Sequence, residues 1–348
     1  MSAVILKDVA KATSLIKKGE VVAFPTETVY GLGAKATSKT AVAKVFTIKK
    51  RPRDNPLICH FHSLEQILEY IVDQPKYFEP LVKHFCPGPV SFLVTIPKTS
   101  PLLPATCGKL SMVCRIPQNS KALELIRQLG FPIVGPSANT SSKMSGVNVE
   151  MIQADLGDRI KAILDDGWSQ VGIESTILDC RYPHQIKILR PGSIGKAELE
   201  KFVQESTQHI QILEALKPST QEVVPGSKYK HYSPKAKIIG LKSVAEALSY
   251  LKNNSSKDQS LGLLVARQDY LELEKSLEYL QTLKTRVLDI GDTLQPDTIA
   301  KKIYFTFYQL DQQAIKTAVL VWPKFGQTSL EKALINRISK AISNTVSK

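Results

Sequence analysis

The chain has 348 residues, more than one typical domain needs, so we expect two globular units that each bury a core. Apolar residues make up 43% of the sequence, which excludes an intrinsically disordered chain. The formal net charge of +14 is spread over both halves. It fits phosphorylated ligands, a transient RNA contact or a solvated basic surface, and does not choose among them.

The five cysteines include no Cys-x-x-Cys pair, so neither a zinc ribbon nor a disulfide framework is indicated. A reducing compartment fits them best. Charged residues arrive before a signal-peptide core could form, and no apolar run approaches the roughly 18 residues that span a bilayer. We therefore expect a cytoplasmic protein without membrane contact.

The first 200 residues alternate between helical and strand patterns. Residues 8–18 predict a helix, and residues 21–24 predict a strand that stops at Pro25. A second helix is expected from Ser38 to the cluster Lys49-Lys50-Arg51, because a proline follows. Further strands are expected at residues 57–61, 90–96, 112–116, 132–134, 173–178 and 186–189. This pattern predicts a mixed α/β domain around one central sheet.

The remaining chain divides into two parts. Residues 204–236 contain scattered prolines and show no clean period, which indicates an interdomain linker. Capping boxes that start at Ser243 and Thr328 then open two helices. Strands are expected between the helices, at residues 238–239, 261–266, 287–290 and 318–322. We therefore predict an N-terminal domain over residues 1–203, the linker, and a small α/β domain with a parallel sheet over residues 237–348.

A glycine pair near the N-terminus poses a choice. Residues 31–36, GLGAKA, fit the G-x-G-x-x-A form of the dinucleotide fingerprint, and Asp54 follows about twenty residues on. In a dinucleotide fold the first glycine follows its strand almost at once. Here the strand ends near Phe24, and Ser38, the best helix cap, lies beyond the glycines. The dinucleotide interpretation is disfavoured, and a tight glycine turn is the plain alternative.

Five ordered motifs point elsewhere. They are PTETVYGLG at residues 25–33, KKRP with NPL at 49–52 and 55–57, PSAN at 136–139, EST at 174–176 and LRPG at 189–192. Read together, they resemble the YrdC-like threonylcarbamoyl-AMP synthases. The resemblance covers residues 8 to about 200, and residues 225–234 resemble the interdomain loop of the long, two-domain form. It implies a YrdC-like twisted mixed sheet with flanking helices, followed by a small Rossmann-like α/β domain.

The resemblance also implies an activity. The protein would be a nucleotidyltransferase that makes threonylcarbamoyl-AMP and pyrophosphate from L-threonine, bicarbonate or CO2, and ATP with Mg2+. The product would serve threonylcarbamoyladenosine modification of tRNA, and a downstream threonylcarbamoyl transferase would receive it. A carbamate carboxylate is already ionised at neutral pH, so such a site needs cations and hydrogen-bond donors rather than a general base.

Site residues are carried over from the same motifs. The resemblance implies that Lys49 and Arg51 are catalytic cations. For ATP it implies Arg51, Asn55, Ser111, Ser137, Asn139, Ser145, Arg190, His231 and Tyr232. For L-threonine it implies Thr28, His60, Arg115 and Ser175, and no metal is assigned to a protein side chain. We expect Arg51 and Arg190 to be partly solvated, and the linker to close over the nucleotide as a lid.

Other interpretations stay open. A lysine and an arginine at a helix end ordinarily only complement the helix dipole, and Ser/Asn clusters ordinarily form turns. His60, His62 and Cys59 lie close in sequence, but a third zinc ligand at a sensible spacing is missing. An RNA-binding regulatory protein of the same fold without ATP chemistry is the alternative function, and carbamoyl-phosphate chemistry is a third. A weak tRNA contact is compatible with the charge.

Overall fold

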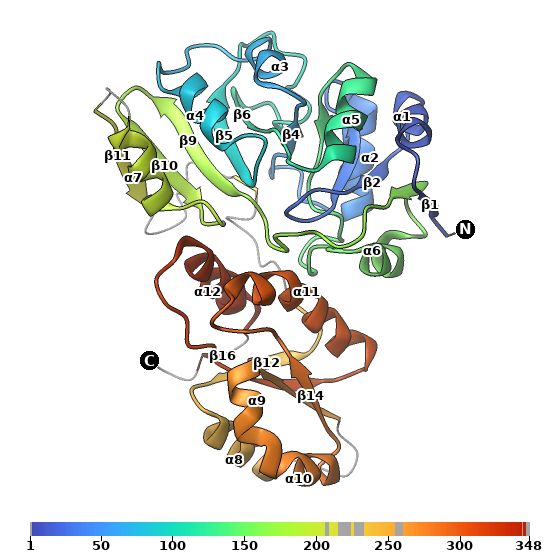
Figure 1. Ribbon diagram of the computed structural model, residues 1–348. Coiled ribbons are helices and arrows are strands. Elements are labelled where there is room, and N and C mark those ends of the chain that lie inside the picture. Colours follow the sequence, from blue (N-terminus) through green and yellow to red (C-terminus); the bar gives the residue numbers. More distant parts are fainter. Residues whose placement is uncertain are drawn as a thin grey trace. The chain divides into compact units, whose positions relative to one another are not determined.

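The computed structural model describes residues 2–205, 209–214, 224–225, 233–254, 260–342 and 344–345. The chain forms two compact units (Figure 1). Unit 1 comprises residues 1–141 and 145–229, and unit 2 comprises residues 142–144 and 230–348. Within the described ranges, no helix combines the length and the apolar character that crossing a membrane requires.

Unit 1 contains a mixed sheet. Its strands are β1 (Val4–Leu6), β2 (Val22–Phe24), β3 (Gly31–Lys35), β4 (Ile58–His60), β5 (Val90–Thr95), β6 (Ser111–Arg115), β7 (Ile133–Val134), β8 (Ala162–Leu164), β9 (Thr176–Tyr182), β10 (Gln185–Arg190) and β11 (Gln211–Glu214). Among the described residues they pair in the order β1-β8-β2-β3-β7-β4-β6-β5-β9-β10-β11. The sheet combines parallel pairs such as β4 with β6 and antiparallel pairs such as β5 with β6, so the expected mixed sheet is confirmed.

Helices flank this sheet. They are α1 (Val9–Lys17), α2 (Lys39–Lys49), α3 (Leu64–Leu68), α4 (Phe78–Phe85), α5 (Ser120–Leu129), α6 (Val149–Leu156) and α7 (Lys196–Gln204). Side chains of α1 and α5 share one apolar cluster with β2, β7 and β8, whereas α2, α3, α4, α6 and α7 contribute to a larger cluster. These two clusters make up most of the core of unit 1, and a smaller cluster includes Ile58 and Val113.

Local sequence signals set the ends of α2. Ser38 accepts a hydrogen bond from Ala41 N and caps the first turn, as the sequence predicts. The helix ends where Lys50 adopts a left-handed conformation with a φ of 51°. The turn redirects the chain, so Lys49 is buried at the helix end while Lys50 is exposed.

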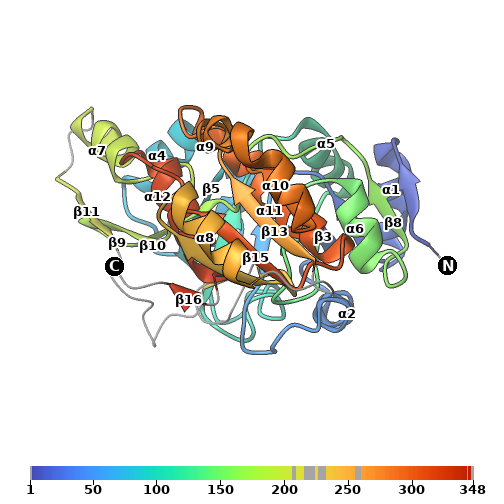
Figure 2. The same ribbon diagram turned by 90° about the horizontal axis from the view of Figure 1, so that it is seen from below.

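Unit 2 is a smaller α/β structure. Its strands are β12 (Lys237–Leu241), β13 (Leu261–Val265), β14 (Thr285–Asp289), β15 (Thr317–Val321) and β16 (Asn344–Thr345), in the order β14-β13-β15-β12-β16. Its helices are α8 (Val244–Asn254), α9 (Arg267–Leu273), the 3-10 turn η1 (Glu274–Ser276), α10 (Leu277–Thr282), α11 (Pro296–Gln312) and α12 (Ser329–Ala341). Every strand pair among the described residues of unit 2 is parallel, which confirms the sequence prediction. Helices α8 to α10 cover one face of the sheet and α11 and α12 the other (Figures 1 and 2).

The structure contains strands that the sequence analysis did not predict, among them β1, β8 and β16. Two further differences concern the glycine pair and the linker. The glycine pair does not form a turn: Gly31 to Lys35 is strand β3, antiparallel to β2. A Cβ on Gly31 would lie 2.7 Å from the Phe24 ring, so the glycine permits close packing of the two strands. The second difference is β11, a strand inside the expected linker that pairs with β10. Its four residues are too few to show a period in the sequence.

Candidate active site

The candidate site lies on one face of the unit 1 sheet, and strand alternation selects that face. In β4 and β6, the parallel partners Ile58 with Val113 and His60 with Arg115 project to the same side. Cys59 and Cys114, which alternate with them, belong to the helix-covered core. Each strand therefore presents one set of side chains to the helices and the other to the site.

Arg115 is held at the end of β6 by residues of the PTETVYGLG motif. Its Nη1 donates to Thr28 Oγ1 at 2.7 Å, and its Nη2 lies 2.8 Å from a Glu27 carboxylate oxygen. Thr26 Oγ1 donates to Val29 O at 2.6 Å, so the Thr28 hydroxyl at 2.8 Å must donate to Thr26. The Thr28 oxygen is thereby left as an acceptor for Arg115.

The ion pair of Glu27 and Arg115 is buried and incompletely hydrogen-bonded. The two side chains are 3% and 5% exposed. Among the described residues, neither Glu27 carboxylate oxygen nor Arg115 Nη2 has an aligned hydrogen bond. Such groups cost free energy when they stay unsatisfied, so the arrangement suits a polar ligand that completes their hydrogen bonds.

His60 is also buried, on the same face of the sheet. Burial lowers the pKa of its imidazole well below the ordinary value, and the Arg115 charge lowers it further, so the ring is neutral. Phe24 packs edge-on against it, with ring centroids 5.5 Å apart. A Cβ on Gly135 would lie 2.5 Å from the ring, so the glycine makes room for it. Its Nδ1 has no hydrogen-bond partner within the described part of the chain.

Ser175, the residue before β9, contacts two other strands, β5 and β10. Its hydroxyl lies 2.8 Å from Ser91 Oγ of β5 and accepts from Arg190 Nη2 at 3.1 Å. Arg190 Nε donates to Ser175 O, and Arg190 Nη1 donates to Pro225 O, both at 3.0 Å. Val224 packs beside them on an apolar patch of the same sheet face. Arg190 therefore joins the start of β9 to a described piece of the expected linker.

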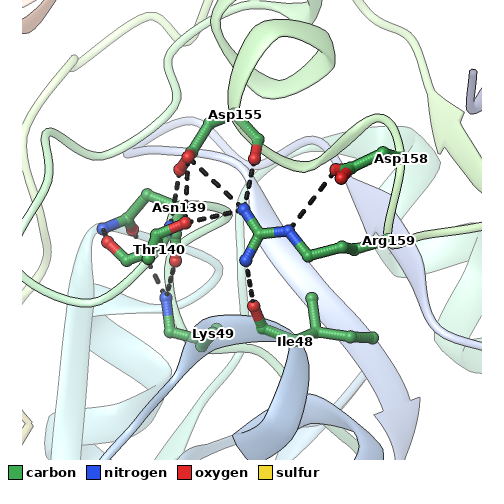
Figure 3. Close-up of polar contacts among 7 residues, drawn as sticks. All are labelled: Ile48, Lys49, Asn139, Thr140, Asp155, Asp158 and Arg159. Carbon is green, nitrogen blue, oxygen red and sulfur yellow. Dashed lines mark hydrogen bonds and ion pairs between the residues drawn. The ribbon is translucent and has the colours of Figure 1, made fainter.

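The Ser137–Asn139 segment follows β7 and contacts Lys49, and Figure 3 shows the contacts with Asn139. The Lys49 ammonium donates to Ser137 O, to Asn139 O at 2.7 Å and to Asn139 Oδ1 at 3.4 Å. Burial lowers the pKa of Lys49 well below its ordinary value, and the neighbouring Arg51 charge adds to the effect. Lys49 therefore donates its hydrogen bonds to the segment that the resemblance assigns to the nucleotide.

Arg51 and Asn55 form the adjoining turn. Arg51 Nε donates to Asn55 O at 2.9 Å, and its Nη2 donates to Asn55 Oδ1 at 2.7 Å and to Pro56 O at 2.8 Å. Arg51 is 9% exposed and Arg190 is 5% exposed. The expectation that these arginines are partly solvated is therefore wrong, because backbone carbonyls draw both guanidinium groups into the protein.

The remaining predicted site residues come from three further segments. Ser145 is buried and donates to Glu174 at 2.6 Å. Ser111 is half-buried and begins β6, two positions along the strand from Val113 and on the same face. His231 and Tyr232 lie outside the described residues, as does the rest of the expected lid at residues 226–232.

Sequence reasoning missed several residues of this site. Glu27 lies within the motif PTETVYGLG, and a carboxylate between two threonines could have indicated a polar binding site. Ser91 carries no local signal, because only the sheet pairing brings it to Ser175. The same is true of Asp155 in α6 and of Arg159, three residues beyond that helix, which both contact Thr140, the residue after Asn139 (Figure 3).

Fold and site together define an α/β enzyme of the Sua5, YciO and YrdC class. The model of that family, described as "Telomere recombination", matches residues 14–192. A second model, described as "Threonylcarbamoyl-AMP synthase, C-terminal domain", matches residues 194–343. The chain belongs to the threonylcarbamoyl-AMP synthase family.

Individual relatives agree with this assignment. The threonylcarbamoyl-AMP synthase of Bacillus subtilis is 33% identical over 97% of this chain and 94% of its own length. That of Pyrococcus abyssi is 32% identical over 95% and 92%, respectively. The crystal structure of P. abyssi Sua5 complexed with L-threonine matches this chain with a TM-score of 0.84 and 28% identity, and the match covers 100% of each chain. These matches support the expected enzyme and not the RNA-binding alternative.

Proposed function

We propose that this protein is a nucleotidyltransferase that joins L-threonine, bicarbonate or CO2, and ATP into threonylcarbamoyl-AMP and pyrophosphate. The observation that carries the proposal is the set of buried polar groups around Arg115 that lack hydrogen-bond partners among the described residues: the Glu27 carboxylate, Arg115 Nη2 and His60 Nδ1. They supply a cation, an anion and a neutral imidazole to one face of the sheet. An amino acid with a hydroxyl side chain presents the complementary groups.

The proposed reaction balances without a protein base. The threonine amine adds to CO2 and loses a proton to water, which gives a carbamate. A carbamate oxygen then attacks the α-phosphorus of ATP, a new P–O bond forms, and the bond to the β-phosphate breaks with pyrophosphate as the leaving group. We assign Arg115 to the threonine carboxylate, because a guanidinium fits a carboxylate in bidentate geometry.

The nucleotide is assigned to the neighbouring Ser137–Asn139 segment. Lys49 fixes the carbonyls of this segment and leaves the Ser137 hydroxyl as a contact for a phosphate or ribose oxygen. Mg2+ is assigned to the triphosphate, since no three His, Cys, Asp or Glu side chains of the described residues are grouped for a metal. When bound, Mg2+ would neutralise phosphate charge. Delivery of the product to a downstream transferase for tRNA modification is part of the proposal.

The test is pyrophosphate release from a mixture of protein, ATP, Mg2+, L-threonine and bicarbonate. Release should require both threonine and bicarbonate, and valine should replace threonine poorly, because a site that hydrogen-bonds a hydroxyl rejects the analogue that lacks it. Equal release with threonine or bicarbonate omitted would show that the proposed reaction is wrong.

A further inference from the structure

We propose that Asp155 and Arg159 are positioning residues that set the geometry of the nucleotide segment. They form a brace, defined here as the contacts of these two side chains with Thr140 and Ile48 (Figure 3). The inference rests on the proposed function, because it concerns the segment assigned to ATP. It adds two residues that act through Thr140 rather than on the substrate.

The brace is a closed set of hydrogen bonds around Thr140. The Asp155 carboxylate accepts from Thr140 N at 2.6 Å and from Thr140 Oγ1 at 2.9 Å. Because the hydroxyl spends its proton on Asp155, its oxygen is available to accept from Arg159 Nη2, at 2.8 Å. One threonine is therefore fixed through its backbone and through its side chain, and both contacts involve a charged group.

Arg159 extends the brace to the helix that carries Lys49. Its Nη1 donates to Ile48 O at 2.6 Å, in the last turn of α2. Carbonyls in a last helical turn have no partner within the helix, so this one is available to an outside donor. Arg159 thereby links the end of α2 to the residue that follows Asn139. A shift of the segment relative to the helix would break these bonds.

The other side of the segment is held by Lys49. Its ammonium donates to Ser137 O and Asn139 O, and its own carbonyl accepts from Ser141 N at 2.8 Å. Because residues 137–141 are contacted on both sides, the segment is fixed in a single position relative to α2. A nucleotide contact needs such preorganisation, because a loop that must be ordered on binding lowers the affinity.

A helix cap alone would predict something different. If Arg159 served only to satisfy the end of α2, its loss would lower the melting temperature and leave substrate affinities alone. The carboxylate of Asp155 argues for the wider role, because it accepts two hydrogen bonds from Thr140, one from the backbone and one from the hydroxyl. Substitutions there should act on the nucleotide segment before they act on the helix.

Neighbouring Asp158 supplies a matched control. Its carboxylate lies 3.4 Å from Arg159 Nε, but its side chain is 79% exposed, so the pair contributes little. Asp155 and Arg159 line a surface hollow of about 650 Å³. Their substitution therefore requires no repacking of an apolar core, and folded variants are expected.

The experiment measures kcat and the KM values for ATP and L-threonine in Asp155→Asn, Arg159→Gln, Arg159→Lys and Asp158→Asn. Loss of one or two hydrogen bonds in the brace should raise the KM for ATP roughly tenfold in Asp155→Asn and Arg159→Gln. The KM for threonine should change less than about twofold, since the brace does not reach Arg115. Arg159→Lys should recover part of the loss, and Asp158→Asn should match the wild type.

A double substitution tests whether the residues act as a unit. Thr140→Val combined with Asp155→Asn should raise the KM for ATP by less than the product of the two single changes, because both single changes disrupt the contact of Thr140 Oγ1 with Asp155. Additive effects, equal changes in both KM values, or a lowered melting temperature with an unchanged KM for ATP would each overturn the positioning role. A wild-type protein that releases no pyrophosphate would overturn the proposed function and this inference together, whereas active variants with wild-type KM values would overturn the inference alone.

Discussion

Individual buried side chains carry the strongest functional signal in this protein. The polar groups around Arg115 are nearly inaccessible, yet several lack aligned hydrogen bonds among the described residues. A fold that needed them only for stability would satisfy them. Their state fits a site organised for a polar ligand, and two substitutions separate binding from stability.

The first prediction concerns the protonation of His60. Its pKa in the folded state is well below the ordinary value of about 6.5, to which it returns on unfolding. Below that pH the unfolded chain binds one proton more than the folded chain, so the free energy of unfolding falls as the pH falls. The contribution is up to about 1.4 kcal/mol for each pH unit below the unfolded pKa.

Urea unfolding at pH 7, 6 and 5 checks this prediction in wild type and His60→Gln. A Trp322→Phe background leaves Trp168, which lies in unit 1, as the fluorescent reporter. The stability advantage of wild type over His60→Gln should shrink between pH 7 and pH 5. A constant difference would mean that His60 titrates normally in the folded protein.

The second prediction concerns Thr28, whose oxygen accepts from Arg115. Thr28→Val preserves the shape of the side chain and removes the acceptor that orients the guanidinium. We expect the KM for threonine to rise roughly tenfold, the order expected for one charged hydrogen bond. The KM for ATP should stay within about twofold. Steady-state kinetics with each substrate varied in turn measures both, and a larger change for ATP would contradict the assignment of this turn to threonine.

At the scale of elements, the pairing of β2 with β3 fixes the position of Phe24, which packs against the site residue His60. Phe24 packs against the glycines of β3 and against the His60 ring. Gly31→Ala would place a Cβ 2.7 Å from the Phe24 ring and push that ring toward His60. We expect a loss of roughly 1–3 kcal/mol in stability, the usual cost of overpacking, and a raised KM for threonine.

A second-site change controls for this effect. Phe24→Leu in the Gly31→Ala background removes the ring that the new methyl group meets and should restore part of the stability. Thermal unfolding of the single and double variants tests the coupling. If Phe24→Leu does not raise the stability of the Gly31→Ala protein, the clash with Phe24 is not the reason that position 31 requires glycine.

The sequence predicts these elements unevenly. Strands with alternating or continuous apolar residues, such as β5 and β13, and helices with clear caps, such as α2 and α12, are confirmed close to their predicted bounds. Strand β3 was missed because its glycines read as a turn, although a paired strand accepts them where a large ring packs against them. The brace was missed because Ile48, Thr140 and Asp155 are separated in the sequence and meet only in the folded domain.

At the scale of the whole molecule, the first unit extends into the expected linker. Val224 is buried on the site face of the sheet, and Pro225 accepts from Arg190. A chain that ends at Leu216 lacks both contacts, whereas a chain that ends at Tyr229 keeps them. Burying one valine side chain contributes roughly 1.5–3 kcal/mol.

The fourth prediction compares these two shortened chains. The chain that ends at Tyr229 should be more stable to urea than the chain that ends at Leu216, by roughly the contribution of the valine. Val224→Ala in the longer chain should remove about half of that difference, since it deletes two of the three side-chain carbons. Equal stability of the two chains would mean that residues 217–229 add nothing to unit 1.

The two-sided strands beneath the site have a consequence for tolerance to mutation. In β4 and β6, neighbouring positions serve stability and function in turn. Cys59 and Cys114 face the helix-packed core, while His60 and Arg115 face the site. In a scan of every substitution, changes at the first pair should reduce the amount of folded protein in the cell. Changes at the second pair should spare abundance more than they spare activity. Along each strand, positions that mainly lower abundance should alternate with positions that mainly lower activity. This alternation would reveal the two-residue period of the strand from the effects of the substitutions alone.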